Sequence, residues 1–236
     1  MFKFLLVFLI ATPIFAQQSG IVEYEYIYTP DFNKSAKDYI EHKAISTVDK
    51  AAEYAKQYRY ILKFNPKESL YQIETGIDPD DVEDPMAYHL SKMILGHGIF
   101  YQNLPKHYTL NQKETMHKLF LVKDSIKNDW TINYEKKMIG GYKCYKATKK
   151  CPCGRDIVAW FTPEIPLPFG PAGYAGTPGL ILQLTFFKHT LRMKKLTLRK
   201  KPVVMTPPSK GEPITKVKLE NRLWNKRMEI MTKNRR

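Results

Sequence analysis

Short stretches in which apolar and polar side chains alternate constrain the fold of this chain more than any other feature of its sequence. In residues 21–28, Val22 and three tyrosines fall on one face and two glutamates on the other, a pattern typical of a half-buried strand. Further strands are predicted at 60–64, 69–74, 99–102, 108–110, 118–122, 130–134, 154–162, 180–187 and 190–199. Many short strands separated by turn signals predict a fold dominated by antiparallel sheet.

Two segments have the period of a helix instead. Apolar residues recur every three or four positions in 34–58, and again, among many lysines and arginines, in the closing segment of about 213–234. The sequence therefore predicts an α+β fold: a predominantly antiparallel, curved β-sheet with an inserted N-terminal helix and a basic C-terminal helix. Because no repeat or clear linker divides residues 17–236, we expect a single β-rich domain that includes the C-terminal helix.

Two details of strand pairing are also predicted. The segments 138–148 and 154–162 read as the two strands of a hairpin. In 190–199 the apolar side chains change from odd to even positions at Lys194-Lys195, and this change of parity predicts a β-bulge there.

The first 16 residues, MFKFLLVFLIATPIFA, have the pattern of a secretory signal peptide: Lys3, a short apolar run and a small residue at Ala16. The apolar run is shorter than the roughly 18–20 residues that a membrane span needs. We therefore expect a signal peptide at 1–16 and a mature chain from Gln17 without a transmembrane anchor. The expected location is the periplasm or the cell envelope.

The formal net charge is +15, and most of it lies in the C-terminal part, where residues 189–236 hold 15 Lys or Arg and 3 Glu. Such a charge favours nucleic acid as the partner of a cytosolic protein, but export makes nucleic acid an unexpected partner here. An anionic membrane surface or an acidic envelope protein fits the compartment better. The favoured interpretation, however, is a solvated basic helix and strand that only keep the protein soluble.

Four longer passages carry a resemblance to a known family. They are YILKFNPKESLYQIE (60–74), DWTINYEKKMIGGYKCYKAT (129–148), GRDIVAWFTPEIPLPFGP (154–171) and YAGTPGLILQL (174–184). In content, order and spacing they resemble the GLPGLI family of exported proteins from the Bacteroidetes. The resemblance implies export and a compact β-rich domain, and it implies no established biochemical activity. Two departures stand out: Thr177 replaces the usual Leu, and Cys151 and Cys153 are not part of the family pattern.

The segment that gives this family its pattern places a sharp corner directly before an apolar strand. Gly176 and Gly179 can adopt positive φ, and Pro178 fixes its own φ. Leu180 and Ile181 then begin the strand. We interpret these five residues as a fold determinant that brings the chain from a surface loop into the core in fixed register.

The loop before the corner offers an alternative role for this region. Residues 163–176 are rich in proline and glycine, and loops held on rigid sheets often carry binding sites. In that case Pro168, Gly170, Pro171 and Tyr174 would shape the mouth of a ligand site.

Cys144, Cys151 and Cys153 are the sharpest candidates for chemistry, because the predicted hairpin brings all three toward one end. Two thiolates one residue apart suit copper or zinc, although no histidine lies near them to complete a site. In an oxidising compartment a disulfide between Cys144 and one of the pair is the favoured interpretation. Free thiols are the third alternative.

The sequence contains no Gly-x-Ser-x-Gly, no His-Glu-x-x-His, no phosphate loop and no dinucleotide-binding motif. It therefore points to no catalytic residue, and no cofactor is expected. The leading hypothesis is a non-catalytic binding or envelope-assembly protein that holds an apolar ligand or partner segment on its sheet. The alternatives are a metal-handling protein that uses Cys-Pro-Cys and a hydrolase of envelope polymers.

Overall fold

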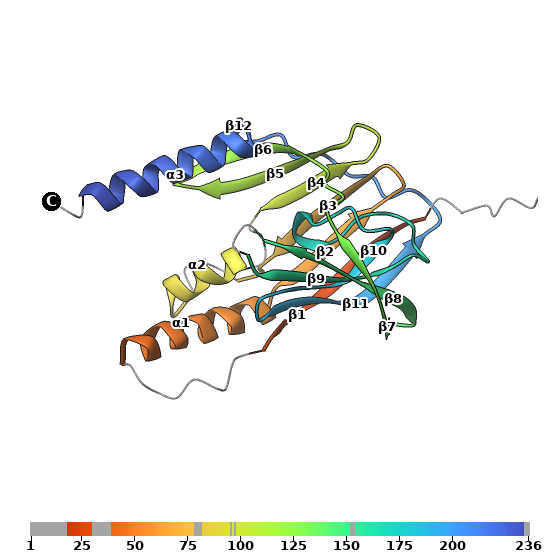
Figure 1. Ribbon diagram of the computed structural model, residues 1–236, viewed down its shortest axis with the longest axis horizontal. Helices are drawn as coiled ribbons and strands as arrows, with labels where there is room; N and C mark the ends of the chain where they lie inside the picture. Colours follow the sequence, from red (N-terminus) through yellow and green to blue (C-terminus); the bar gives the residue numbers. More distant parts are fainter. Residues whose placement is uncertain are drawn as a thin grey trace, which may run out of the picture.

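The computed structural model describes residues 18–29, 39–77, 82–94, 96, 98–151 and 154–233 (Figure 1). The predicted signal peptide at 1–16 lies outside these residues. One mixed, mostly antiparallel sheet of 12 strands dominates the fold. Its strands are β1 (Ser19–Tyr28), β2 (Arg59–Phe64), β3 (Glu68–Glu74), β4 (Ile99–Asn103), β5 (Tyr108–Thr115), β6 (Lys118–Ser125), β7 (Thr131–Ile139), β8 (Tyr142–Lys150), β9 (Asp156–Thr162), β10 (Leu180–Phe186), β11 (His189–Arg199) and β12 (Glu212–Thr215).

The sheet is open, with spatial order β12-β6-β5-β4-β3-β2-β1-β11-β10-β9-β8-β7. β1 lies between β2 and β11, so the first strand of the described chain joins an N-terminal half-sheet to a C-terminal one. All pairs are antiparallel except β12 with β6, which is parallel. This arrangement confirms the predicted sheet-dominated, mostly antiparallel fold.

The predicted bulge in β11 is confirmed. Glu23 is opposite Lys195 and Tyr24 is opposite Met193, so Lys194 is the extra residue in the pairing with β1. The bulge moves the apolar side chains of β11 from one parity to the other: Leu191 and Met193 before it are buried, Leu196 after it is partly buried and Leu198 is 47% exposed.

The predicted hairpin is also present, with β8 paired to β9, but its first strand begins later than expected. Residues 138–139 belong to β7. Gly140 and Gly141, at φ 55° and 87°, make a two-residue turn between β7 and β8. Two consecutive positive φ angles are what this tight turn requires, and glycine supplies both without steric cost.

In the described residues the sheet is accompanied by the α-helices α1 (Tyr39–Lys56), α2 (Pro85–Ile94) and α3 (Lys216–Lys233) and by a short 3-10 helix at Pro171–Gly173. The structure has α1 within the predicted 34–58, of which residues 34–38 lie outside the described part, and α3 within the predicted 213–234. Neither α2 nor β12 was predicted. α1 and α2 pack against each other, and α3 lies beside β6 and β12 at the edge of the sheet; all three helices lie toward the left in Figure 1.

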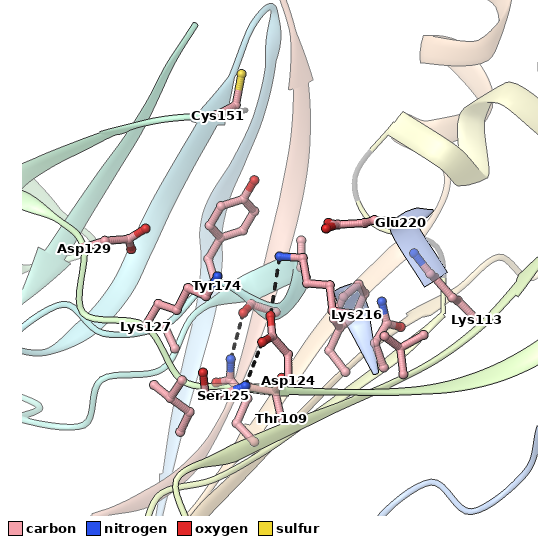
Figure 2. A pocket seen from close by; sticks show the side chains of 18 of the residues that line it. Thr109, Lys113, Asp124, Ser125, Lys127, Asp129, Cys151, Tyr174, Lys216 and Glu220 are labelled. Atoms are coloured by element: carbon pink, nitrogen blue, oxygen red, sulfur yellow. Dashed lines mark hydrogen bonds and ion pairs between the residues drawn. The ribbon is translucent and has the colours of Figure 1, made fainter. Parts of the chain in front are cut away.

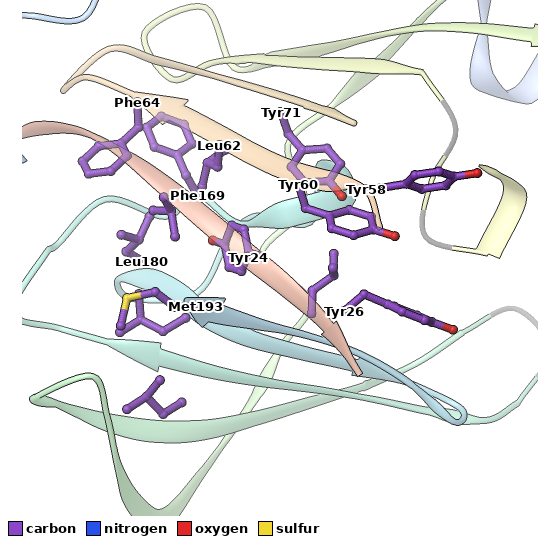
Figure 3. Packing of buried hydrophobic residues seen from close by; sticks show 14 of the residues in the cluster. Tyr24, Tyr26, Tyr58, Tyr60, Leu62, Phe64, Tyr71, Phe169, Leu180 and Met193 are labelled. Carbon is purple, nitrogen blue, oxygen red and sulfur yellow. The ribbon is translucent and has the colours of Figure 1, made fainter. Parts of the chain in front are cut away.

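The main core is rich in tyrosine, and several of its hydroxyl groups have fixed partners. The Tyr24 hydroxyl donates to the carbonyl oxygen of Ile181 at 2.7 Å, and that of Tyr60 donates to Ala55 at 2.8 Å. Figure 3 shows these rings beside Phe64, Phe169 and Leu180. The core thus joins the central strands to the 163–176 loop and to the corner that follows it.

His189 makes the stability of the central strands sensitive to acid. Its ring stacks against Tyr26 and Tyr28, and its Nδ1 is 2.7 Å from the Tyr26 hydroxyl. Burial, and next the charge of Lys188, lower the pKa of His189 below its ordinary value of 6.5. The folded protein therefore binds fewer protons here than the unfolded chain as the pH falls below 6.5.

We expect the free energy of unfolding to decrease as the pH falls from 6.5 through the lowered pKa of His189, and then to level off. Urea unfolding of wild type and His189→Gln across this range measures the contribution. The variant should lose the pH-dependent step, whereas His117→Gln, at an exposed histidine, should keep it. A step of equal size in His189→Gln would contradict the assignment.

Candidate ligand-binding cleft

A cavity of about 560 Å³ lies between the 171–175 loop, strands β4–β6 and the start of α3. Figure 2 shows its two sides, with Tyr174 and Asp129 across from Lys113 and Glu220. Its apolar lining comes from Phe100, Val122, Ile126, Ile157, Leu219 and Leu223. Its charged lining is predominantly basic: Lys113, Lys127, Lys149, Lys150 and Lys216 against Asp124, Asp129 and Glu220.

Strand alternation supplies the polar part of the sheet wall. Thr109, Asn111 and Lys113 are every second residue of β5 and therefore share a face. Across the strand pair, Asp124 is opposite Thr109 and Val122 is opposite Asn111, so β6 adds one acid and one apolar side chain.

Helix α3 completes this wall through a small apolar cluster. Leu219 packs with Phe120, Val122 and Ile214, which lie on β6 and β12. The packing holds the first turns of α3 over the strands, and Lys216 forms an ion pair with Asp124 at 3.5 Å. The parallel pairing of β12 with β6 therefore decides where the helix begins.

The 171–175 loop forms the opposite wall. Gly173 has φ 77°, and a Cβ at this position would lie 2.4 Å from the Phe100 ring, so only glycine fits. Its carbonyl accepts a hydrogen bond from the Gln102 side chain at 2.8 Å, and the Trp130 indole donates to Ala175 at 2.7 Å. These contacts fix the loop against both halves of the sheet.

Lys149 is held on the loop side of the cavity by an acid and two aromatic rings. Its ammonium group is 3.1 Å from Asp129, 4.6 Å from the centre of the Trp130 ring and 5.2 Å from that of Tyr174. Burial raises the pKa of Asp129, but the hydrogen bond and charge of Lys149 outweigh it, and the net shift is downward. Lys149 is therefore satisfied within the protein.

Lys113 is in a different situation on the opposite wall. It forms no ion pair with any residue that the structure describes, although it is partly buried. Burial lowers its pKa, the charge of Lys216 lowers it further, and Glu220 acts in the opposite direction. Asn111, two residues earlier on the same wall, has a buried side-chain oxygen without a hydrogen-bond partner in the described part of the chain. An acidic ligand would relieve the charge, and a ligand hydroxyl or ordered water would satisfy the oxygen.

The four residues predicted as a ligand mouth lie in the loop that forms this wall, but only Tyr174 lines the cavity. Gly170 packs on Ile181, and the carbonyl groups of Pro168 and Pro171 accept hydrogen bonds from Gly176 and Tyr174 at 3.0 Å. Sequence reasoning missed Lys113, Asn111 and Lys149. For Asn111 and Lys113, the only signal in the sequence was the run of polar residues at every second position of 108–115. A strand in the middle of a sheet is expected to have an apolar face instead.

The Gly-Thr-Pro-Gly corner packs against two distant parts of the chain: Gly176 lies against the backbone of Lys127, and Gly179 lies against the backbone of Thr162. Gly176 has φ 92°, as a positive-φ turn requires, but Gly179 is not in that region. Gly179 is needed for space instead, because a Cβ there would lie 2.0 Å from the carbonyl oxygen of Thr162. Thr177 is buried, and its hydroxyl donates to the Gly179 carbonyl at 2.7 Å, so the corner is held by a hydrogen bond within itself.

The strand after the corner is tied to the loop before it. The amide of Leu180 donates to Ile165, and the amide of Ile181 donates to Phe169, both at 2.9 Å. Leu180 and Ile181 are fully buried. The corner therefore fixes the loop that forms one wall of the cavity.

The cysteines differ from the expected arrangement. Cys144 is a buried free thiol, and burial is the main cause that raises its pKa to about 11. Cys151 is disulfide-bonded and lies at the other end of β8, about 23 Å away at the usual rise of a strand. The expected disulfide of Cys144 is therefore wrong, and a site that includes both Cys144 and Cys151 does not form. Cys153 lies outside the described residues.

Within the described ranges, no three His, Cys, Asp or Glu side chains come together in a way that suits a metal ion. The copper or zinc site that the sequence offers as an alternative includes Cys153, which these ranges do not contain, so it stays a prediction. Soft metals bind thiolates, and the sulfur of Cys151 is in a disulfide.

Comparison with known proteins supports the family resemblance. A family model described as "Protein of unknown function (Porph_ging)" matches residues 149–183, which include β9, the loop and the corner. Over these residues the match agrees with the resemblance to the GLPGLI family. No curated protein matches the chain.

Among solved structures, the chain is similar to PNGF-II in two crystal forms. The TM-scores are 0.56 and 0.55, at 13% and 12% sequence identity. The match covers 88% of this chain and 33% of PNGF-II, so the chain spans about a third of that protein's length. At this identity the likeness shows a shared fold alone.

Proposed function

We propose that this protein is a non-catalytic binding protein that acts after export, in the periplasm or cell envelope. Its ligand has an apolar body and an acidic group. The observation that carries the proposal is the combination, in one cavity of about 560 Å³, of an apolar lining with the partly buried and unpaired Lys113. The cavity is large enough for a small ligand, since such sites have volumes of roughly 300–1,000 Å³.

Each part of the proposed ligand corresponds to a part of the cavity. The apolar body would lie against Phe100, Val122 and Leu223, whose side chains come from β4, β6 and α3. The acidic group would pair with Lys113, beside Lys216. The cavity therefore supports an acidic amphiphile rather than a purely apolar ligand, because a partly buried cation that forms no ion pair is unfavourable.

Titration calorimetry with decanoate and with its neutral analogue decanol tests this proposal. In Lys113→Met, which removes the charge and keeps much of the apolar stem, we expect the affinity for decanoate to fall by about 10–100-fold, the usual effect of one hydrogen bond to a charged group. The affinity for decanol should change little.

The matched control is Lys118→Met, which removes an exposed lysine of β6 outside the cavity. It should leave both affinities unchanged. The proposal is wrong if neither probe binds the wild type, or if decanoate binds Lys113→Met as tightly as the wild type.

A further inference from the structure

Helix α3 carries two apolar stripes, of which only one is used in folding. The inner stripe contains Leu219 and Leu223, which pack on the strands beneath. The outer stripe contains Val217, Trp224, Met228 and Met231, which are 66%, 61%, 43% and 53% exposed. At about 100° per residue these four side chains lie within one narrow strip along the helix, well separated from the inner one.

Basic side chains border the outer stripe. Residues 216–233 contain six Lys or Arg and two Glu. Lys216, Arg222 and Lys226 form ion pairs with Asp124, Glu212 and Glu229.

Lys218 and Arg227, by contrast, form no ion pair with any residue in the described ranges. They fall on opposite sides of the stripe, each roughly 90° from its centre. An exposed apolar strip thus has an uncommitted positive charge along each edge.

The position of α3 leaves this stripe accessible. The helix contacts β6 and β12 near its start, and Figure 1 shows its second half projecting beyond the sheet toward the C-terminus. Eighteen residues of α-helix are about 27 Å long, which is enough to lie along a surface. No helix among the described residues is long and apolar enough to cross a membrane.

We infer that α3 binds the surface of an anionic phospholipid membrane, with its outer stripe at the boundary between headgroups and acyl chains. Helices that lie in this interface have an apolar face with Trp and basic residues beside it. Lys218 and Arg227 would meet the phosphate groups, while Leu219 and Leu223 keep the helix attached to the sheet. Charge complementarity favours this occupant over a second copy of the chain, because two such helices would bring their basic edges together.

Trp224 reports directly on this contact in the full chain. The fluorescence of Trp224 itself is obtained by subtracting the spectrum of Trp224→Phe from that of the wild type. The subtraction removes the signals of Trp130 and Trp160, and it removes any effect of membrane binding through residues 1–16. With vesicles of phosphatidylglycerol and brominated phosphatidylcholine at low salt, we expect the bromine to quench this difference signal. Vesicles of brominated phosphatidylcholine alone should quench it little, and high salt should reverse the quenching.

Vesicle sedimentation of surface variants gives the second measurement. We expect Trp224→Ser with Met228→Ser, and separately Lys218→Gln with Arg227→Gln, to lower partitioning onto the mixed vesicles by about tenfold or more. Met86→Ser is the control, since Met86 is 74% exposed on α2, away from α3, and should have no effect.

Three results would overturn the inference. The first is the absence of any Trp224-specific quenching at low salt. The second is a loss of partitioning in Met86→Ser as large as in the α3 variants. The third is a dimer in native mass spectrometry that Trp224→Ser dissociates, because a second copy would then occupy the stripe.

Discussion

Replacing Gly179 with alanine is expected to destabilise the protein by about 3 kcal/mol or more. The added Cβ would lie 2.0 Å from the carbonyl oxygen of Thr162 and 3.0 Å from the Cα of Pro163. Both are backbone atoms, so no side-chain rotation relieves the overlap. Relief requires β10 to move away from the end of β9, which disturbs the burial of Leu180 and Ile181.

Urea unfolding followed by circular dichroism measures this effect, with Gly76→Ala as the matched control. Gly76 has φ 61° and open space around its missing side chain, so the control carries only the strain of a left-handed residue, about 1 kcal/mol. If Gly179→Ala costs no more than Gly76→Ala, space at the corner is not the reason for this glycine.

Replacing Phe120 with alanine should cost about 3–5 kcal/mol and should act mainly on α3. Phe120 is fully buried and is the largest side chain in the cluster that holds α3 and β12 to β6. Because α3 has few other contacts with the sheet, the loss of this anchor should release the helix before the central strands unfold.

Hydrogen exchange resolved along the chain measures this release. Amide protection in 216–233 should fall sharply in Phe120→Ala, while protection in β1, β2 and β11 should stay close to that of the wild type. Leu119→Ala is the control, because the neighbouring Leu119 is 40% exposed. Uniform loss of protection across the sheet would contradict a local role for Phe120.

The same anchor connects the two proposals. Lys216, Leu219 and Leu223 belong to the wall of the cavity, whereas Trp224 and Met228 belong to the outer stripe. A helix that lies on a membrane with its inner face lining a ligand cavity would place that cavity close to the lipid surface. Phe120→Ala should therefore weaken decanoate binding as well as loosen α3.

Local patterns in the sequence predict much of the fold. Strand signals in the sequence marked the strands now numbered β1–β11, and the parity change at Lys194 marked the bulge. β12 was missed because four residues with a proline are too few to show a period. α2 was missed because its ten residues follow an acidic stretch that reads as a loop.

The cavity was not predictable in this way, because its walls come from segments far apart in the chain. Lys113, Lys149 and Lys216 look like ordinary surface lysines in the sequence. Their ion pairs distinguish them: Lys149 forms an ion pair with Asp129 and Lys216 forms one with Asp124, whereas Lys113 forms an ion pair with neither acid. Likewise, the sequence suggested that Cys144 and Cys151 lie close together. The register of β8 and β9 shows that Cys151 lies at the turn of this hairpin and Cys144 at the end away from the turn.

The amino-acid sequence by itself determined most of the strands, the bulge and the corner, because each depends on residues within a few positions of one another. The tertiary structure alone decided that β1 joins the two half-sheets, that Gly179 is required by contact with Thr162, and that the partly buried Lys113 forms no ion pair with a described residue. Alternation shows that one face of a strand is buried, but not which strand or loop covers it. That choice is made by contacts between distant residues, which no local pattern encodes.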